Sequence, residues 1–345
     1  MTVAGHVLVI GGAGFIGSNV TDSFLRSGSR VTVYDNFSRP GGAANGRWLK
    51  SEHGRRVRVL RGDVRRGGVR LRRLIDEADL IVHNAGQVAV TTSVADPRAD
   101  FETNAAGTFE VLEALRASRR RPPMVFSSTN KVYGNLPGVR TRRLGRRYAF
   151  ADRPQGISEE QPLDFHSPYG CSKGAADQYV RDYARIYGLP TVVFRKSCIY
   201  GPRQFGVEDQ GWVAWFTIAA LLGRPITIYG DGKQVRDVLH IDDLVRAYRC
   251  AFRRIRDVAG EVFNIGGGPR NTMSLLELLE MLKELLGRPV PVGYDDWRPG
   301  DQVIYVSDIR KARRDLGWTP AVAPEAGVRR LYRWIAANRQ LFRLG

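Results

Sequence analysis

Three glycines at every third position, Gly11, Gly14 and Gly17, follow directly after the short apolar run His6–Ile10. That run is rich in β-branched residues and too short for a helix, so it is typical of a buried strand. In a strand–turn–helix unit, the first glycine allows a tight turn, the second lets a ligand approach the backbone, and the third lets the helix pack on the strand. The spacing therefore predicts a helix over residues 15–27 whose N-terminal amides receive a dinucleotide pyrophosphate. The residues predicted to contact the dinucleotide here are Gly11, Gly14, Phe15, Ile16 and Gly17.

An acidic residue lies where such a unit needs one. A second apolar run, 30–34, ends at Asp35, about twenty residues after the glycines. A carboxylate there accepts hydrogen bonds from the adenosine ribose hydroxyls and repels a 2′-phosphate, which favours NAD over NADP. The other interpretation is that Asp35 only begins the turn 35–38. Because strand, glycines and acid occur in the required order, we predict NAD as the cofactor, with Asn36 also in contact with it.

Further apolar runs alternate with helical stretches. The runs 57–63, 80–86, 123–128 and 191–195 are predicted strands, and Asn104 is predicted to begin a helix. This alternation predicts an α/β fold with a Rossmann-type, doubly wound parallel sheet, and a ligand crevice at the carboxyl ends of the strands. Residues at or just after the ends of these runs are predicted to contact the adenine, ribose and nicotinamide of NAD. They are Asp63, Val64, Ala85 and Ser127.

Tyr169 and Lys173 lie four residues apart in the segment 166–173. At this spacing on a helix two side chains share a face, so the lysine charge is expected to lower the pKa of the tyrosine toward the working pH. A phenolate beside a bound nicotinamide can take the proton of a hydroxyl while the carbon gives up hydride. Thr129, which follows the run 123–128, is a third candidate. Each has a plainer interpretation: the pair as part of an amphipathic helix, and Thr129 as a turn residue.

These segments, in this order, resemble the extended short-chain dehydrogenase/reductase family that acts on nucleotide sugars. The resemblance runs from Gly11 to the regions 298–301 and 316–320. Within the family, the chain is most similar to the CDP-paratose 2-epimerases, also called CDP-tyvelose epimerases. The segments that carry this similarity are 128–134, 163–179, 203–205 with 209–212, and 232–240.

The resemblance implies a chemistry for the set Thr129, Tyr169 and Lys173. Tyr169 accepts the C2 hydroxyl proton, Lys173 sustains the phenolate and holds the nicotinamide ribose, and Thr129 hydrogen-bonds the reacting hydroxyl. The implied function is NAD-dependent inversion at C2 of a CDP-linked hexose or dideoxyhexose through a transient 2-keto sugar. A 4-epimerase acting on a UDP-, GDP- or CDP-linked sugar is the alternative, since the same residues would serve either carbon. A 4,6-dehydratase is less favoured, because Asn130 and Lys131 stand where that reaction needs an acid and a base.

The C-terminal part of the sequence has a different pattern, in which short apolar runs are separated by Gly and Pro. We expect 1–198 to form the NAD-binding domain and 199–345 a smaller substrate-binding lobe, from which about 238–262 returns to the larger domain. By resemblance, Arg236 and Arg298 bind the substrate diphosphate, because a guanidinium can donate hydrogen bonds to two phosphate oxygens at once. The expected substrate contacts are Thr129, Asn130, Arg203, Arg236 and Arg298, with Arg203 the weaker arginine candidate.

Two segments depart from the family pattern. Ser197 and Cys198 stand where many relatives carry an asparagine, and the segment 83–86 reads His-Asn-Ala-Gly in place of the more usual His-Leu-Ala-Ala. A further alternative is an NAD-binding protein without activity. Such proteins typically lack the tyrosine or the lysine of the pair, and both are present here.

Charge and cysteine content bear on the partners. The formal net charge of +18 raises the hypothesis of a nucleic-acid-binding protein. The arginine clusters lie in different predicted elements without interleaved aromatic residues, so we expect a nucleotide-diphosphate sugar as partner and no nucleic acid. No apolar run is long enough for a membrane span and no leader precedes the first strand, so we expect a cytoplasmic enzyme. The three cysteines lack metal-ligand spacing, and we expect no metal. By the same resemblance, the helix after Asn104 and the helix of Tyr169 are expected to pair in a homodimer or higher homo-oligomer.

Overall fold

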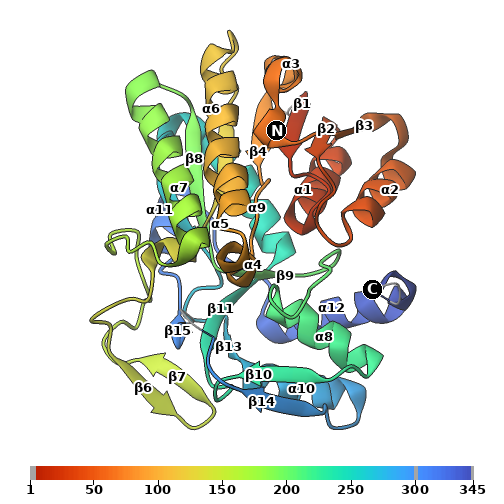
Figure 1. The fold of residues 1–345 in the computed structure, drawn as a ribbon, viewed down its shortest axis with the longest axis vertical. Coiled ribbons are helices and arrows are strands. Elements are labelled where there is room, and N and C mark those ends of the chain that lie inside the picture. The colour runs from red at the N-terminus through yellow and green to blue at the C-terminus, as the bar shows by residue number, and fades with distance from the viewer. Residues whose placement is uncertain (1–4, 299–301, 343–345) are drawn as a thin grey trace.

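The computed structural model describes residues 5–298 and 302–342 of the 345-residue chain. Its larger part is a seven-stranded parallel sheet in the order β12-β8-β5-β4-β1-β2-β3, and helices cover both faces (Figure 1). The strand order reverses between β1 and β4, so this is the doubly wound sheet that the sequence predicts. The strands are β1 (His6–Ile10), β2 (Arg30–Asp35), β3 (Val57–Arg61), β4 (Leu80–His83), β5 (Met124–Thr129), β8 (Thr191–Lys196) and β12 (Val262–Ile265).

Two cores form because successive residues of a strand point to opposite faces of the sheet. In β1, Val7 and Val9 belong to one core, whereas Leu8 and Ile10 belong to the other. The first core is covered by α1 (Phe15–Arg26), α2 (Gly42–His53), α9 (Ile241–Val258) and α11 (Arg310–Leu316). The second is covered by α3 (Gly68–Glu77), α6 (Gly107–Ala117) and α7 (Ser167–Tyr187).

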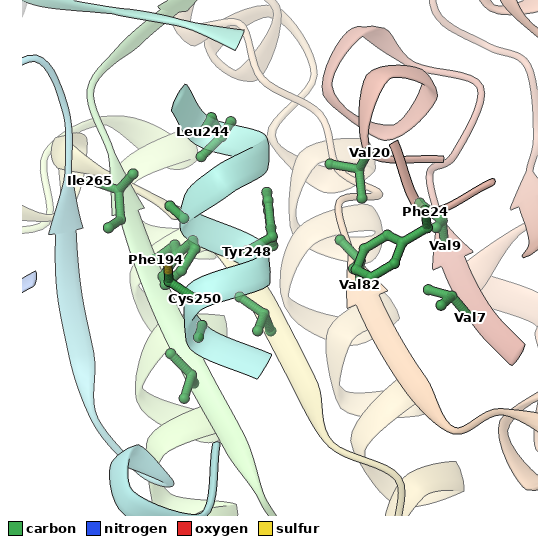
Figure 2. Close-up of a cluster of buried hydrophobic side chains, with 14 of the residues drawn as sticks. Val7, Val9, Val20, Phe24, Val82, Phe194, Leu244, Tyr248, Cys250 and Ile265 are labelled. Atoms are coloured by element: carbon green, nitrogen blue, oxygen red, sulfur yellow. The ribbon is translucent and has the colours of Figure 1, made fainter. Parts of the chain in front are cut away.

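Helix α9 is distant from β1 in sequence but shares the first core with it (Figure 2). Leu244 and Tyr248 of α9 lie near Phe194 of β8, and Val20 and Phe24 of α1 lie near β1 and β4 (Figure 2). Tyr248 is fully buried, and its hydroxyl lies 2.6 Å from the Ser127 Oγ at the carboxyl end of β5. The packing of α9 therefore reaches the edge of the sheet where the ligand crevice is expected.

The helix predicted to begin at Asn104 begins earlier, so that prediction is wrong. Helix α5 (Pro97–Phe101) starts after Asp96, whose side chain caps it by accepting from the Ala99 amide at 3.0 Å. A π-helical turn, η3 (Glu102–Ala106), then joins α5 to α6. Asn104 lies inside this turn and is fully buried. π-Helical turns often occur at functional sites, because the wider turn redirects side chains.

The remaining elements form a smaller part beneath the carboxyl ends of the large sheet (Figure 1). Its core is built largely from α8, α10 and α12. Its helices are α8 (Trp212–Leu222), α10 (Leu275–Leu286) and α12 (Pro324–Ala337), and its strands are β9 (Cys198–Tyr200), β10 (Ile226–Tyr229), β11 (Val235–His240), β13 (Thr272–Ser274), β14 (Val292–Asp295) and β15 (Ile304–Tyr305). A separate hairpin, β6 (Thr141–Leu144) and β7 (Arg147–Phe150), and the short helix α4 (Val90–Ala95) complete the fold.

The chain crosses between the two parts more than once. Strand β12 and helix α9, both beyond residue 198, belong to the large sheet and its core, and β11 pairs with β9. The expected boundary at 198/199 stays a prediction. Within the described residues, no helix has the length and apolar character needed to cross a membrane.

Candidate active site

Two adjoining cavities open at the carboxyl edge of the large sheet. One, of about 390 Å³, is lined by the β1–α1 turn and the ends of β2 and β3. The other, of about 610 Å³, lies between the ends of β5 and β8 and the elements α8, β10 and β11. Both volumes are in the range of small-molecule sites. The residues that line both cavities include Phe15, Ile16, Asn84, Gly86, Lys196 and Gln204.

The glycine turn of the first cavity has the close packing that the motif predicts. Gly11 has φ +78°, and a Cβ on it would lie 2.5 Å from the Ala85 nitrogen. A Cβ on Gly17 would lie 2.1 Å from the Gly11 carbonyl oxygen, so helix and strand approach too closely for any side chain. At Gly14, the N-cap of α1, the nearest atom is 3.5 Å away and no side chain caps the helix. The amides at this helix end therefore remain available to a pyrophosphate, and the turn fits NAD.

The acidic residues of this cavity are held in place by backbone and side-chain donors. The Asp35 carboxylate accepts from the amides of Ala13 at 2.9 Å and Phe37 at 2.7 Å, although burial raises its pKa. Asp63 pairs with Arg65, which holds the pKa of that carboxyl at about 2. These contacts fix Asp35 and Asp63 at neighbouring strand ends. Most residues predicted to bind NAD line this first cavity, whereas Ser127, Tyr169 and Lys173 line the second one. The predicted residues in the first cavity are Gly11, Gly14, Phe15, Ile16, Gly17, Asp35, Asn36, Asp63, Val64 and Ala85.

The three predicted catalytic residues meet in the second cavity. Tyr169 and Lys173 lie on one face of α7, and Thr129 ends β5. Thr129 hydrogen-bonds the Tyr169 hydroxyl, which favours the phenolate, but burial has the larger effect and raises the pKa of Tyr169 to about 12. The predicted lowering of this pKa is therefore wrong for this structure, because desolvation of the phenolate outweighs the hydrogen bond. Burial also lowers the pKa of Lys173 to about 8, against the charges of Asp177 and Asp100.

A buried polar network, which the sequence analysis missed, fixes the start of α7. The Asn104 amide nitrogen donates to Asp100 Oδ1 and Ser172 Oγ, both at 3.1 Å, and Ser172 also donates to Asp100. The Tyr169 amide donates to Ser93 Oγ at 3.1 Å. Apart from the Asn104–Asp100 bond, the partners are 68 to 76 residues apart in sequence, so no local pattern signals the network. It ties α4, α5 and η3 to the turn of α7 that carries Tyr169.

A buried ion pair anchors the middle of α7. Arg195 of β8 binds both carboxylate oxygens of Asp177, each at 2.9 Å, and Ser128 of β5 donates to the same carboxylate at 2.7 Å. Both charged side chains are at most 2% exposed. Bidentate geometry of this kind holds two elements in one register. It keeps Lys173, one turn before Asp177, opposite the end of β5.

The predicted substrate contacts divide between the cavities. Thr129, Asn130, Arg236 and Arg298 line the second cavity together with Lys131. Arg298 pairs with Asp209 at 3.0 Å and lies 3.9 Å from the centre of the Tyr229 ring. Arg203 instead lines the first cavity and stacks 3.9 Å above Trp48. The structure therefore brings together two of the three arginines, and the rest of the region 298–301 lies outside the described residues.

The two departures from the family pattern also reach these cavities. Cys198 lines the second cavity, and its sulfur accepts a hydrogen bond from the Trp212 indole at 3.4 Å. Asn84 lines both cavities, and its carbonyl oxygen accepts from Ser127 and from Tyr248, the latter at 2.7 Å. Neither position carries the side chain that the family pattern would place there.

The fold and these two cavities define the chain as an NAD-dependent enzyme of the extended short-chain dehydrogenase/reductase class. Its cofactor is NAD. The chain belongs to the NAD dependent epimerase/dehydratase family, whose model matches residues 7–266.

Several relatives cover almost the whole chain. This chain is 44% identical to a CDP-paratose 2-epimerase of Salmonella typhi. The alignment spans 338 residues and covers 96% of this chain and 99% of that protein. The chain is also 33% identical over 362 residues to a dTDP-glucose 4,6-dehydratase of Neisseria gonorrhoeae, covering 97% of this chain and 96% of that protein.

Solved structures agree with the fold at the same coverage. The UDP-glucose 4-epimerase of Thermotoga maritima, crystallised with UDP-glucose, matches with a TM-score of 0.82 at 32% identity, over 97% of this chain and 99% of that one. The UDP-glucuronic acid 4-epimerase of Bacillus cereus, crystallised with UDP-glucuronic acid and NAD, matches with a TM-score of 0.83 at 28% identity. The match covers 96% of this chain and 99% of that one.

Proposed function

We propose that this protein inverts C2 of a CDP-linked hexose or dideoxyhexose of the CDP-paratose kind, through a transient 2-keto sugar. The observation that carries the proposal is the 44% identity, over 96% of the chain, to a CDP-paratose 2-epimerase. By comparison, two 4-epimerases match at 29% and 32% identity, and two 4,6-dehydratases match at 33% and 34%. The three residues in the second cavity supply the acid–base groups that such a reaction needs.

In this proposal, Tyr169 accepts the C2 hydroxyl proton and later returns it. NAD, when bound, supplies a reversible hydride acceptor. Thr129, already hydrogen-bonded to the Tyr169 hydroxyl, also receives the reacting sugar hydroxyl. Burial and the charge of Asp100 oppose ionisation of the phenol, so we assign to Lys173, one turn further along α7, the ammonium that sustains the phenolate. Proton transfer to Tyr169 thus depends on the charge of Lys173.

The substrate diphosphate is held by Arg236 and Arg298, which line the same cavity as Tyr169. Arg298 is paired with Asp209 in this structure. Binding of a diphosphate therefore involves an exchange, in which phosphate oxygens replace or share the carboxylate partner of this guanidinium. Asn130, at the start of a short 3-10 helix, η4 (Asn130–Tyr133), is positioned to orient the sugar.

Elimination of water is less favoured at this site. A dehydratase needs an acid and a base next to Thr129, and the chain has Asn130 and Lys131 there, both lining the cavity. The carboxylates that line the cavity, Glu208 and Asp209, interact with Tyr229 and Arg298 instead. A 4-epimerase remains the alternative, because Thr129, Tyr169 and Lys173 can serve either carbon.

The test is a panel of CDP-, UDP- and GDP-linked sugars incubated with the purified protein, with inversion at C2 and C4 followed by NMR. We expect inversion at C2 of a CDP-linked sugar. Deuterium placed at C2 should remain in the product, because hydride returns to the same carbon. Inversion at C4 alone would show the alternative to be correct, and loss of C2 deuterium to solvent would indicate enolisation instead.

We also propose that the protein acts in the cytoplasm as a homodimer formed through α6 and α7. Several large apolar side chains on or next to these helices are exposed, which supports an interface there. They are Phe101, Phe109, Tyr179, Ile186 and Tyr187.

A further inference from the structure

A lysine without an assigned role lies at the junction of the two cavities. Lys196 is the last residue of β8 and lines both the cofactor cavity and the substrate cavity. Its register partner in the neighbouring strand β5 is Thr129. Partners in a parallel ladder project to the same side of the sheet about 5 Å apart. The Lys196 side chain therefore lies beside the residue that we assign to the reacting hydroxyl.

The surroundings of Lys196 do not neutralise it. Among the residues that the structure describes, none forms a hydrogen bond or an ion pair with its amino group, and the charged neighbour that acts on it is Lys173. Burial and this neighbouring positive charge lower the pKa of Lys196 well below its usual value. Lys196 is half-buried, and a lysine in such a place is normally paired, because an unpaired, partly desolvated ammonium is costly. Perturbed and unpaired groups in a cleft are typical of functional sites.

The position also fits a specific need of the reaction. Inversion requires the 2-keto sugar to present its opposite face, so the C2 oxygen must be held in two orientations of the ring. Tyr169 and Thr129 approach the cavity from α7 and β5, whereas Lys196 approaches from β8. In either protonation state an amino group donates hydrogen bonds. It can therefore hold an oxygen that becomes a carbonyl when its proton has left.

We propose that Lys196 is a further catalytic residue, whose amino group hydrogen-bonds the C2 oxygen of the bound sugar during oxidation and reduction. This rests on the proposed function. In the oxidation step the C2–H bond breaks with hydride leaving to NAD, the hydroxyl proton passes to Tyr169, and a C=O bond forms at C2. Lys196 keeps its own protons throughout. Its hydrogen bond stabilises the negative charge that develops on the oxygen, as donors in an oxyanion site do.

The test compares Lys196→Met with the wild type, using substrate with hydrogen or deuterium at C2. Methionine preserves most of the apolar chain and removes the donor. We expect kcat to fall about 100-fold, as for loss of one oxyanion donor. The deuterium isotope effect on kcat should rise, because hydride transfer becomes slower than the other steps, whereas KM and the bound NAD content should stay nearly unchanged.

Two further variants separate chemistry from structure. Lys196→Arg keeps a donor and is expected to recover part of the lost kcat. Lys283→Met removes an exposed lysine of α10, whose partner is Glu280, and is expected to keep the wild-type kcat. If Lys196→Met fails to fold, Lys196→Leu, which also lacks a donor, is used in its place with the same expected fall in kcat.

The outcomes distinguish this proposal from the proposed function. A Lys196→Met protein that inverts C2 at the wild-type rate overturns the role of Lys196 and leaves the function intact. A variant that loses NAD but keeps kcat at saturating NAD also overturns it, because Lys196 would then hold the cofactor. If the wild type inverts C4 and not C2, the proposed function fails. The role of Lys196 is then tested in the C4 reaction, where a Lys196→Met protein with the wild-type kcat overturns it as well.

Discussion

Tyr169 is a buried phenol whose ionisation is opposed by desolvation and by Asp100 and favoured by Thr129 and by the charge of Arg39, so its activity depends on nearby positive charge. We expect Tyr169→Phe to lower kcat by at least about 100-fold, because the proton acceptor is lost. The ring is kept, so NAD should remain bound at the wild-type stoichiometry. Inversion is measured by NMR and NAD by release on denaturation, with Tyr294→Phe, an exposed tyrosine of β14, as control. Wild-type turnover in Tyr169→Phe would refute the mechanism.

The alkaline pH dependence belongs to Lys173. Burial lowers its pKa from 10.5 to about 8, so the ammonium is present below that pH and is lost as the pH rises through it. Because this charge sustains the phenolate, we expect kcat/KM to fall above about pH 8. Lys173→Arg stays charged to above about pH 12, so its activity, although lower, should persist to higher pH. A wild-type profile that stays level to about pH 10 would contradict this role.

At the scale of elements, the β1–α1 turn determines whether NAD can bind. A Cβ on Gly17 would lie 2.1 Å from the Gly11 carbonyl oxygen, so Gly17→Ala must push α1 away from β1. We expect a loss of about 1–3 kcal/mol in the free energy of unfolding and a lower NAD content. Thermal or urea unfolding and NAD release measure these effects. Gly293→Ala is the matched control, since nothing lies within 4 Å of its Cβ position; an equal effect of both changes would show that close packing is not the cause.

The elements themselves were largely predictable. The turn residues and the alternation of apolar runs correctly predicted a doubly wound parallel sheet and six of its seven strands, because strand and helix periodicity are local properties. Strand β12 was not predicted. The start of the helix near Asn104 was predicted wrongly, since the π-helical turn around it is stabilised by Asp100 and by Ser172 of a distant helix. Local spacing carries no information about such a partner.

At the scale of the whole molecule, we expect a dimer formed by α6 and α7, which pack side by side. Phe109 and Tyr179 lie with ring centres 5.8 Å apart and are 39% and 48% exposed. Exposed apolar clusters of this kind favour association. Ile186→Asp should therefore shift the protein toward the monomer in sedimentation equilibrium, whereas Val69→Asp on α3, also exposed, should not. A wild type that sediments as a monomer at micromolar concentration would refute the interface.

The amino-acid sequence by itself determined the cofactor turn, Asp35, the doubly wound parallel sheet and the pair Tyr169 and Lys173. These follow from short spacings, because a tight turn, a strand end or one helix face involves residues only a few positions apart. The tertiary structure alone decided the direction of the Tyr169 pKa, since burial depends on packing from the whole molecule.

Long-range contacts likewise decided which charged residues share a cavity. Arg236 and Arg298 face the substrate cavity and Arg203 does not, although all three are arginines in motif segments. Lys196 lies beside Thr129 only because β8 pairs with β5. Sequence spacing specifies which groups a chain carries, but the pairing of distant strands determines the desolvation, charge and neighbours that give each group its chemistry.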